Sequence, residues 1–136
     1  MATLSTVAAF GFDDFDPPVT LGLYKQLGCQ SSQFYRNENN PPTVEDAIRI
    51  ADDAGLPFDS IHGVFGEQYD PSNPDEAFRR QTVEVYQREG ELAIALGGPM
   101  VVVHPSSMRP PDQSLSPDDR AVRMAALRKS IDELTV

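Results

Sequence analysis

The chain has 136 residues, of which 40% are hydrophobic and 24% charged, and its formal net charge is −10. This length is enough for one domain with a real core, and no window approaches the roughly 18–20 consecutive apolar residues that a membrane span needs. The acidic charge opposes broad contact with nucleic acid, because phosphate binding depends on clustered lysine and arginine. The N-terminus has no secretory signal pattern, and the single cysteine, Cys29, has no partner for an internal disulfide. We therefore expect a cytoplasmic protein.

Short apolar runs alternate along the chain with segments of helical periodicity. The runs predict strands at residues 6–11, 29–35, 58–62 and 100–104. The periodic segments predict helices at residues 19–27, 44–54, 75–96 and 121–134. A strand followed by a helix, four times over, is typical of βαβ crossovers and predicts a parallel sheet.

Local signals mark where several of these helices begin and end. Gly28 and Gly55 are placed as helix C-caps, and Thr43 and Ser116 as N-caps. Residues 12–18 are polar and end in two prolines, which predicts a loop before the first helix.

Four βα units are about half of a (β/α)8 barrel, which needs eight units and about 250 residues. The last predicted helix has no stop signal after Leu134. We therefore expect an α/β fold of parallel (β/α) repeats, about half of a TIM barrel, with residues 1–136 as a single partial domain. The alternative is a small, open, four-stranded α/β domain.

The two histidines, His62 and His104, both stand where a predicted strand ends. In parallel α/β folds the carboxyl ends of the strands are where ligands bind. Imidazole is a good ligand for Zn²⁺ or Mn²⁺, but two nitrogens are too few for a closed tetrahedral site. Water or a missing half would have to supply the other ligands. The alternative is that both are structural histidines.

Two other polar positions are candidates for substrate binding. Arg36 follows the second predicted strand and could hold a phosphate or carboxylate in bidentate fashion. Ser106 follows His104 and could offer a hydroxyl to a polyol or phosphate. Each could equally be a solvated loop residue. No residue stands out as a catalytic acid or base, and no strained nucleophile turn is present.

Several short motifs occur together, in order, along residues 5–136. They are Leu27-Gly-Cys29, Phe34-Tyr-Arg36, Ser60-Ile-His-Gly63, Arg79-Arg80, Glu91-Leu-Ala93, Leu96-Gly97 and Val101-Val-Val-His-Pro-Ser106. With these motifs the chain resembles the xylose isomerase-like TIM-barrel superfamily, which contains sugar phosphate isomerases/epimerases and AP endonuclease type 2 proteins. The resemblance covers nearly the whole chain.

The resemblance implies an enzyme that uses a divalent metal (Mn, Zn, Mg or Co) at the carboxyl-terminal mouth of a barrel. It implies that His62 and His104 are metal ligands, as in the endonuclease branch, or that they line the substrate pocket, as in the isomerase branch. The main metal ligands of both branches come from strands five to eight, which this sequence does not supply. A sugar or sugar-phosphate isomerase or epimerase is therefore expected for a longer parent protein, with a small-molecule sugar as its substrate.

Two alternatives stay open. One is a metal-dependent endonuclease acting at abasic DNA sites, which the acidic charge opposes. The other is an inactive half-barrel fragment whose open edge strands invite self-association.

Overall fold

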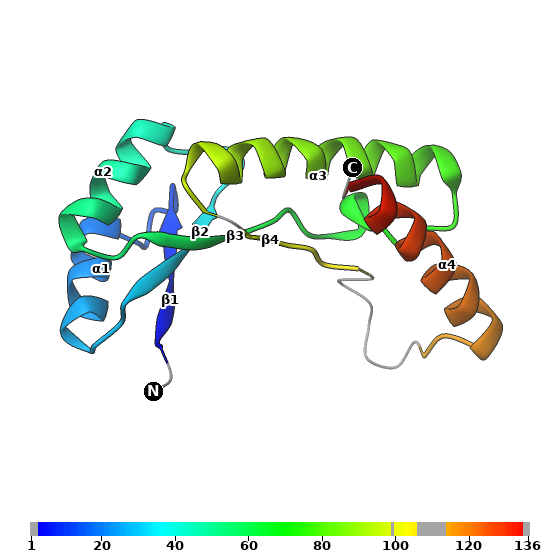
Figure 1. Cartoon of the computed structure of the whole chain (residues 1–136), viewed down its shortest axis with the longest axis horizontal. Coiled ribbons are helices and arrows are strands. Elements are labelled where there is room, and N and C mark those ends of the chain that lie inside the picture. Colours follow the sequence, from blue (N-terminus) through cyan, green and yellow to red (C-terminus); the bar gives the residue numbers. More distant parts are fainter. Residues whose placement is uncertain (1–2, 99, 106–113, 135–136) are drawn as a thin grey trace. The chain divides into compact units, whose positions relative to one another are not determined.

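The structure is a computed structural model that describes residues 3–98, 100–105 and 114–134. Its elements, in chain order, are β1 (Ser5–Phe10), α1 (Pro17–Gln26), β2 (Ser31–Arg36), α2 (Val44–Ala54), β3 (Phe58–His62), the 3₁₀ helix η1 (Glu67–Tyr69), α3 (Glu76–Ala95), β4 (Met100–Val102) and α4 (Pro117–Leu134) (Figure 1). The four strands form one sheet in the order β1-β2-β3-β4, and every neighbouring pair is parallel. The predicted α/β fold of parallel (β/α) repeats is confirmed, and it is consistent with part of a TIM barrel. Over the described ranges, no helix is long and apolar enough to cross a membrane.

The chain divides into two compact units. Unit 1 comprises Met1–His62 and Gly90–Val102, and it holds the whole sheet, α1, α2 and the end of α3. Unit 2 comprises Gly63–Glu89 and Val103–Val136, and it holds η1, most of α3 and α4.

The core of unit 1 is built on one face of the sheet. Phe10 of β1, Phe34 of β2 and Phe58 of β3 form an aromatic triangle, with ring centroids 5.2, 5.4 and 6.1 Å apart. Burying each ring stabilises the fold by about 1.5–3 kcal/mol. The same face holds other buried strand residues and the buried sides of the helices, namely Ala8, Ile61, Leu21, Ala47, Ala51, Leu56, Ala93 and Leu96.

The other face of the sheet holds none of these core residues. Strand alternation and register assign to this open face Ser5, Val7, Ala9, Ser31, Gln33, Tyr35, Asp59, Ser60, His62, Met100 and Val102. Val7 is 44% exposed and Met100 is 58% exposed. Parallel sheets are normally covered on both faces, so an open face of this kind is unusual.

Helix α1 begins two residues earlier than the sequence predicted. The Asp16 side chain accepts a hydrogen bond from the Val19 amide (3.2 Å) and so caps the helix. Pro17 and Pro18 then occupy the first two helical positions. The prediction of a loop through residue 18 was therefore wrong. Proline is tolerated at the start of a helix, because the backbone N–H that it lacks makes no hydrogen bond in the first turn. Helix α4 starts at Pro117, directly after the predicted N-cap Ser116, whose hydroxyl accepts a hydrogen bond from the Asp119 amide (3.1 Å).

The fourth strand is shorter and less buried than expected. It ends at Val102 instead of residue 104, and its residues are exposed or partly buried. Val102 pairs with His62, which is the last residue of β3. Beyond that pair β3 offers no further ladder partner, so the prediction that His104 ends a buried strand was wrong. His104 lies two residues after the strand.

Unit 2 is held together by a buried arginine. Arg79 of α3, 1% exposed, donates to Glu133 of α4 (2.7 and 3.1 Å) and to Glu76 one turn before it (3.0 and 3.1 Å). It also donates to the hydroxyl of Ser130 (3.2 Å), which in turn donates to the carbonyl of Pro71 (2.7 Å). This network joins α3, α4 and the loop that precedes α3.

Candidate functional site

An aromatic row lies at the carboxyl edge of the sheet in unit 1. It consists of Phe12, which follows β1, Tyr35 near the end of β2, and His62, the last residue of β3. The rings of Phe12 and Tyr35 are stacked, with centroids 5.1 Å apart and an interplanar angle of 26°. The rings of Tyr35 and His62 are 5.0 Å apart and tilted by 58°. Three neighbouring strands therefore present π-systems side by side at the edge where parallel α/β folds bind ligands.

The loops that carry the aromatic row are bound to one another. Asn37 and Asn40, from the loop after β2, both donate side-chain hydrogen bonds to the carbonyl of Gly11 (3.1 and 3.3 Å). The Asn37 amide also donates to the carbonyl of Phe10 (2.9 Å). Gly11 has a φ of 76°, and a Cβ there would overlap the Asn40 carbonyl, so only glycine fits. These hydrogen bonds from Asn37 and Asn40 to Gly11, which we call the asparagine clasp, hold Phe12 over Tyr35.

His62 was predicted from the sequence as a site residue, whereas Phe12 and Tyr35 were not. The available signal was that an aromatic residue stands at or just beyond the end of each of the first two strands. This signal was weak, because the segment that begins at residue 11 is polar and rich in proline, and such a composition predicts only a loop. The contact between Phe12 and Tyr35 depends on the asparagine clasp, whose two hydrogen bonds join residues 26 and 29 positions apart.

Arg36 is the last residue of β2, as expected, and it is partly buried. It pairs in register with Phe10, whose side chain lies in the core, whereas Tyr35 pairs with Ala9. Because side chains alternate along a strand, Arg36 and Tyr35 project from opposite faces of the sheet. Ser106, the other predicted substrate contact, lies outside the described residues.

His104 belongs to unit 2, where Tyr86 of α3 supports its backbone. The buried Tyr86 hydroxyl donates to the carbonyl of Val64 (2.7 Å) and accepts from the amide of His104 (3.2 Å). Burial of Tyr86 raises the pKa of its phenol, so the hydroxyl keeps its proton. The ring of Phe65 meets the His104 ring edge-to-face, with centroids 5.7 Å apart. Tyr86 thus ties the loop after β3 to the segment after β4.

A divalent metal would need more ligands than the described side chains bring together. Among residues 3–98, 100–105 and 114–134, no group of three histidine, cysteine, aspartate or glutamate side chains could hold a metal ion. The described side chains therefore do not make a metal centre by themselves.

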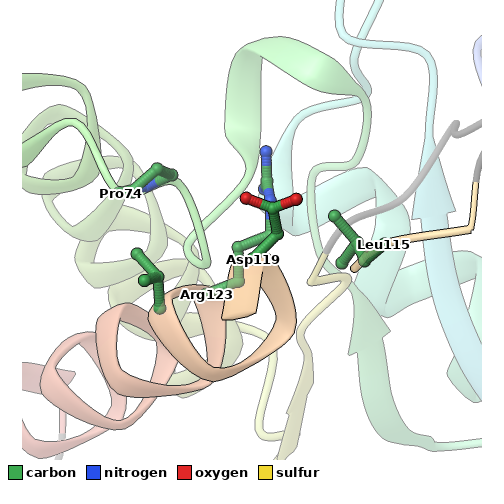
Figure 2. A pocket seen from close by; sticks show the side chains of 5 residues that line it. Pro74, Leu115, Asp119 and Arg123 are labelled. Atoms are coloured by element: carbon green, nitrogen blue, oxygen red, sulfur yellow. The ribbon is translucent and has the colours of Figure 1, made fainter. Parts of the chain in front are cut away.

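Unit 2 also has a pocket of about 280 Å³ at the start of α4. Figure 2 shows its lining, where Asp119 and Arg123 project from α4 and Leu115 precedes the helix. The Arg123 guanidinium is bound to the Asp70 carboxylate (2.7 Å). The pocket contains none of the predicted site residues, and its arginine is already paired.

Comparison with known proteins identifies the family. The model of the xylose isomerase-like TIM barrel family matches residues 4–135, so the chain belongs to that family. A comparison with curated protein sequences found no significant match.

Solved structures show the same fold. A sugar phosphate isomerase/epimerase from Parabacteroides distasonis has a TM-score of 0.65 and 14% identity, with 99% of this chain and 49% of that protein covered. L-ribulose 3-epimerase has a TM-score of 0.66 and 22% identity, with 99% and 46% covered. Endonuclease IV from Thermus thermophilus has a TM-score of 0.54 and 18% identity, with 97% and 47% covered. The chain therefore spans about half the length of the structures that it matches.

Proposed function

We propose that this chain forms one half of a barrel that isomerises or epimerises a sugar or sugar phosphate. The observation that carries the proposal is the aromatic row of Phe12, Tyr35 and His62 at the carboxyl edge of the sheet. Small-molecule sites combine apolar and aromatic surface with a few polar groups that fix orientation. The row offers two aromatic faces for the C–H face of a sugar, together with a phenol and an imidazole for its hydroxyls. Similarity to proteins described as sugar phosphate isomerase/epimerase and L-ribulose 3-epimerase supports this choice.

The roles of individual side chains follow from their chemistry. Tyr35, at the centre of the row, packs its ring against the sugar and hydrogen-bonds through its hydroxyl. His62 binds a hydroxyl through a nitrogen of its imidazole ring. Arg36 and Ser106 stay predictions as contacts to a phosphate or polyol. We assign no catalytic acid or base.

His62 and His104 stay predictions as ligands of a divalent metal, with the other ligands coming from outside the described residues. Such an ion would polarise a carbonyl oxygen of the substrate. The described side chains do not complete a metal site. Dialysed protein exposed to Co²⁺ should gain a visible absorption band that weakens in His104→Ala. The absence of any change in that variant would remove His104 from the ligand set.

The net charge of −10 opposes cleavage of DNA at abasic sites as the function. A gel shift with an abasic duplex at physiological salt is expected to be negative, and a positive result would overturn the choice of sugar chemistry. Self-association through the open edges of β1 and β4 stays a prediction.

Sugar binding can be tested directly on this chain. D-tagatose, L-ribulose and a ketose phosphate would be titrated into isotope-labelled protein, and the ring resonances of Phe12, Tyr35 and His62 followed by NMR. We expect saturable shifts confined to these rings. Tyr35→Ala should abolish them, whereas Tyr35→Phe, which keeps the ring, should weaken binding by about tenfold or less. If no sugar moves these resonances, or Tyr35→Ala binds like the wild type, the proposal is wrong.

A further inference from the structure

The pocket of unit 2 has two side chains of opposite charge in its lining. Its volume is about 280 Å³, and it is lined by Pro74, Leu115, Asp119, Val122 and Arg123. Asp119 and Arg123 are four residues apart on α4, so they lie on one face of that helix (Figure 2). Small-molecule sites typically have volumes of about 300–1,000 Å³, so a ligand of this pocket would be small.

The ion pair of Arg123 with Asp70 uses only one nitrogen of the guanidinium. Nη1 donates to the Asp70 carboxylate (2.7 Å) and to the hydroxyl of Ser72 (3.5 Å). Asp70 is itself held in place, because its other oxygen accepts from the amide and the hydroxyl of Ser72 (2.8 and 2.6 Å). Among the described residues, Nε and Nη2 of Arg123 donate to no acceptor. These two groups form one edge of the guanidinium, and such an edge matches a carboxylate in bidentate fashion.

The carboxylate of Asp119 likewise has one oxygen in use and one available. Oδ2 accepts from the hydroxyl of Ser116 (2.7 Å), which fixes the carboxylate at the first turn of α4. Within the described ranges, Oδ1 accepts no hydrogen bond, and Asp119 forms no ion pair with Arg123. Opposite charges four residues apart on a helix commonly pair, so the lack of pairing here leaves both charges available to a ligand.

A ligand with a single charge fits this lining poorly. An anion bound to Arg123 would also meet Asp119, and a cation bound to Asp119 would also meet Arg123, and in each case like charges repel. A ligand that has both a carboxylate and an ammonium group satisfies both side chains. The rest of the lining, Pro74, Leu115 and Val122, is apolar and suits an aliphatic side chain.

We propose that this pocket binds an α-amino acid with an aliphatic side chain. The carboxylate of the ligand accepts from Nε and Nη2 of Arg123, and its ammonium group donates to Oδ1 of Asp119. Its side chain packs against Leu115 and Val122. None of the residues proposed to contact a sugar lines the pocket, so this site is separate from the proposed sugar site.

Titration of L-leucine into the isotope-labelled full chain, followed by NMR, tests this inference. We expect saturable shifts of the resonances of Leu115, Val122 and Arg123, with a Kd on the order of 1 mM or below. Two analogues each lack one charge of leucine: 4-methylpentanoate has no amine, and 3-methylbutylamine has no carboxylate. Each should bind at least about tenfold more weakly than leucine. No saturable shift with leucine, or an analogue that binds as tightly as leucine, would overturn the proposal.

Substitutions of the two charged side chains test their separate roles. Asp119→Asn removes the charge that faces the ammonium group, and Arg123→Lys keeps a positive charge for Asp70 but loses the bidentate edge. Both should weaken leucine binding by at least about tenfold. Asp118→Asn is the matched control and should bind leucine like the wild type, because Asp118 is exposed in the same first turn and does not line the pocket. Asp119 is also exposed, so Asp119→Asn decides the test if Arg123→Lys does not fold. Wild-type affinity in Asp119→Asn, or an equal loss in Asp118→Asn, would show that the proposed site is wrong.

Discussion

Tyr86→Phe is expected to loosen the backbone around His104 while leaving the packing of the ring intact. The change removes one hydroxyl that donates to Val64 at 2.7 Å and accepts from the His104 amide at 3.2 Å. The Val64 carbonyl is buried, and leaving a buried backbone group without this partner costs about 1–3 kcal/mol. The bond to His104 is longer and contributes less. We therefore expect a loss of about 2–3 kcal/mol in the free energy of unfolding, equivalent to roughly 6–12 °C in Tm.

Two measurements check this expectation. Urea denaturation followed by circular dichroism gives the loss of stability, and hydrogen exchange gives the protection of the His104 amide, which should fall in the variant. Tyr24→Phe is the matched control, since Tyr24 is partly buried and its hydroxyl makes no hydrogen bond within the described ranges. The control should change stability by no more than about 0.5 kcal/mol. A loss for Tyr86→Phe no larger than the control's, with unchanged exchange at His104, would refute the reasoning.

Two further predictions concern stability. Phe34→Ala removes the ring that contacts both other members of the core triangle, so the free energy of unfolding should fall by about 3–5 kcal/mol in urea denaturation, and a loss under 1 kcal/mol would contradict the assigned core. Hydrogen bonds from Arg79 lower the pKa values of Glu76 and Glu133 below the ordinary 4.5, and Lys129 adds to this effect on Glu76. The stability from these pairs is therefore complete above pH 4.5 and is lost as the pH falls through the lowered pKa values. Arg79→Met should be less stable than wild type at pH 7, with a gap that narrows on acidification, and a gap independent of pH would show that the ion pairs do not stabilise unit 2.

Part of the candidate site was predictable and part was not. His62 could be placed at a strand end from the sequence, because the apolar run before it and the glycine after it are local signals. The rest of the aromatic row was not predictable in this way. Phe12 lies in a loop whose conformation depends on the asparagines that bind Gly11 from the next βα unit. Ser106 stays a prediction, since it lies outside the described residues.

The sequence by itself determined the order of the elements and the parallel sheet, because hydrophobic periodicity and helix caps are properties of neighbouring residues. Thr43 and Gly55, for example, are the N-cap and the C-cap of α2, as predicted. Only the tertiary structure decided the early end of β4 and the burial of Arg79. Strand ends depend on the register of a partner strand, as the pair of Val102 with His62 shows. A charged side chain such as Arg79 can be buried only when hydrogen-bond acceptors surround it. Its acceptors Ser130 and Glu133 lie far away in the sequence, so the residues next to Arg79 do not predict its burial.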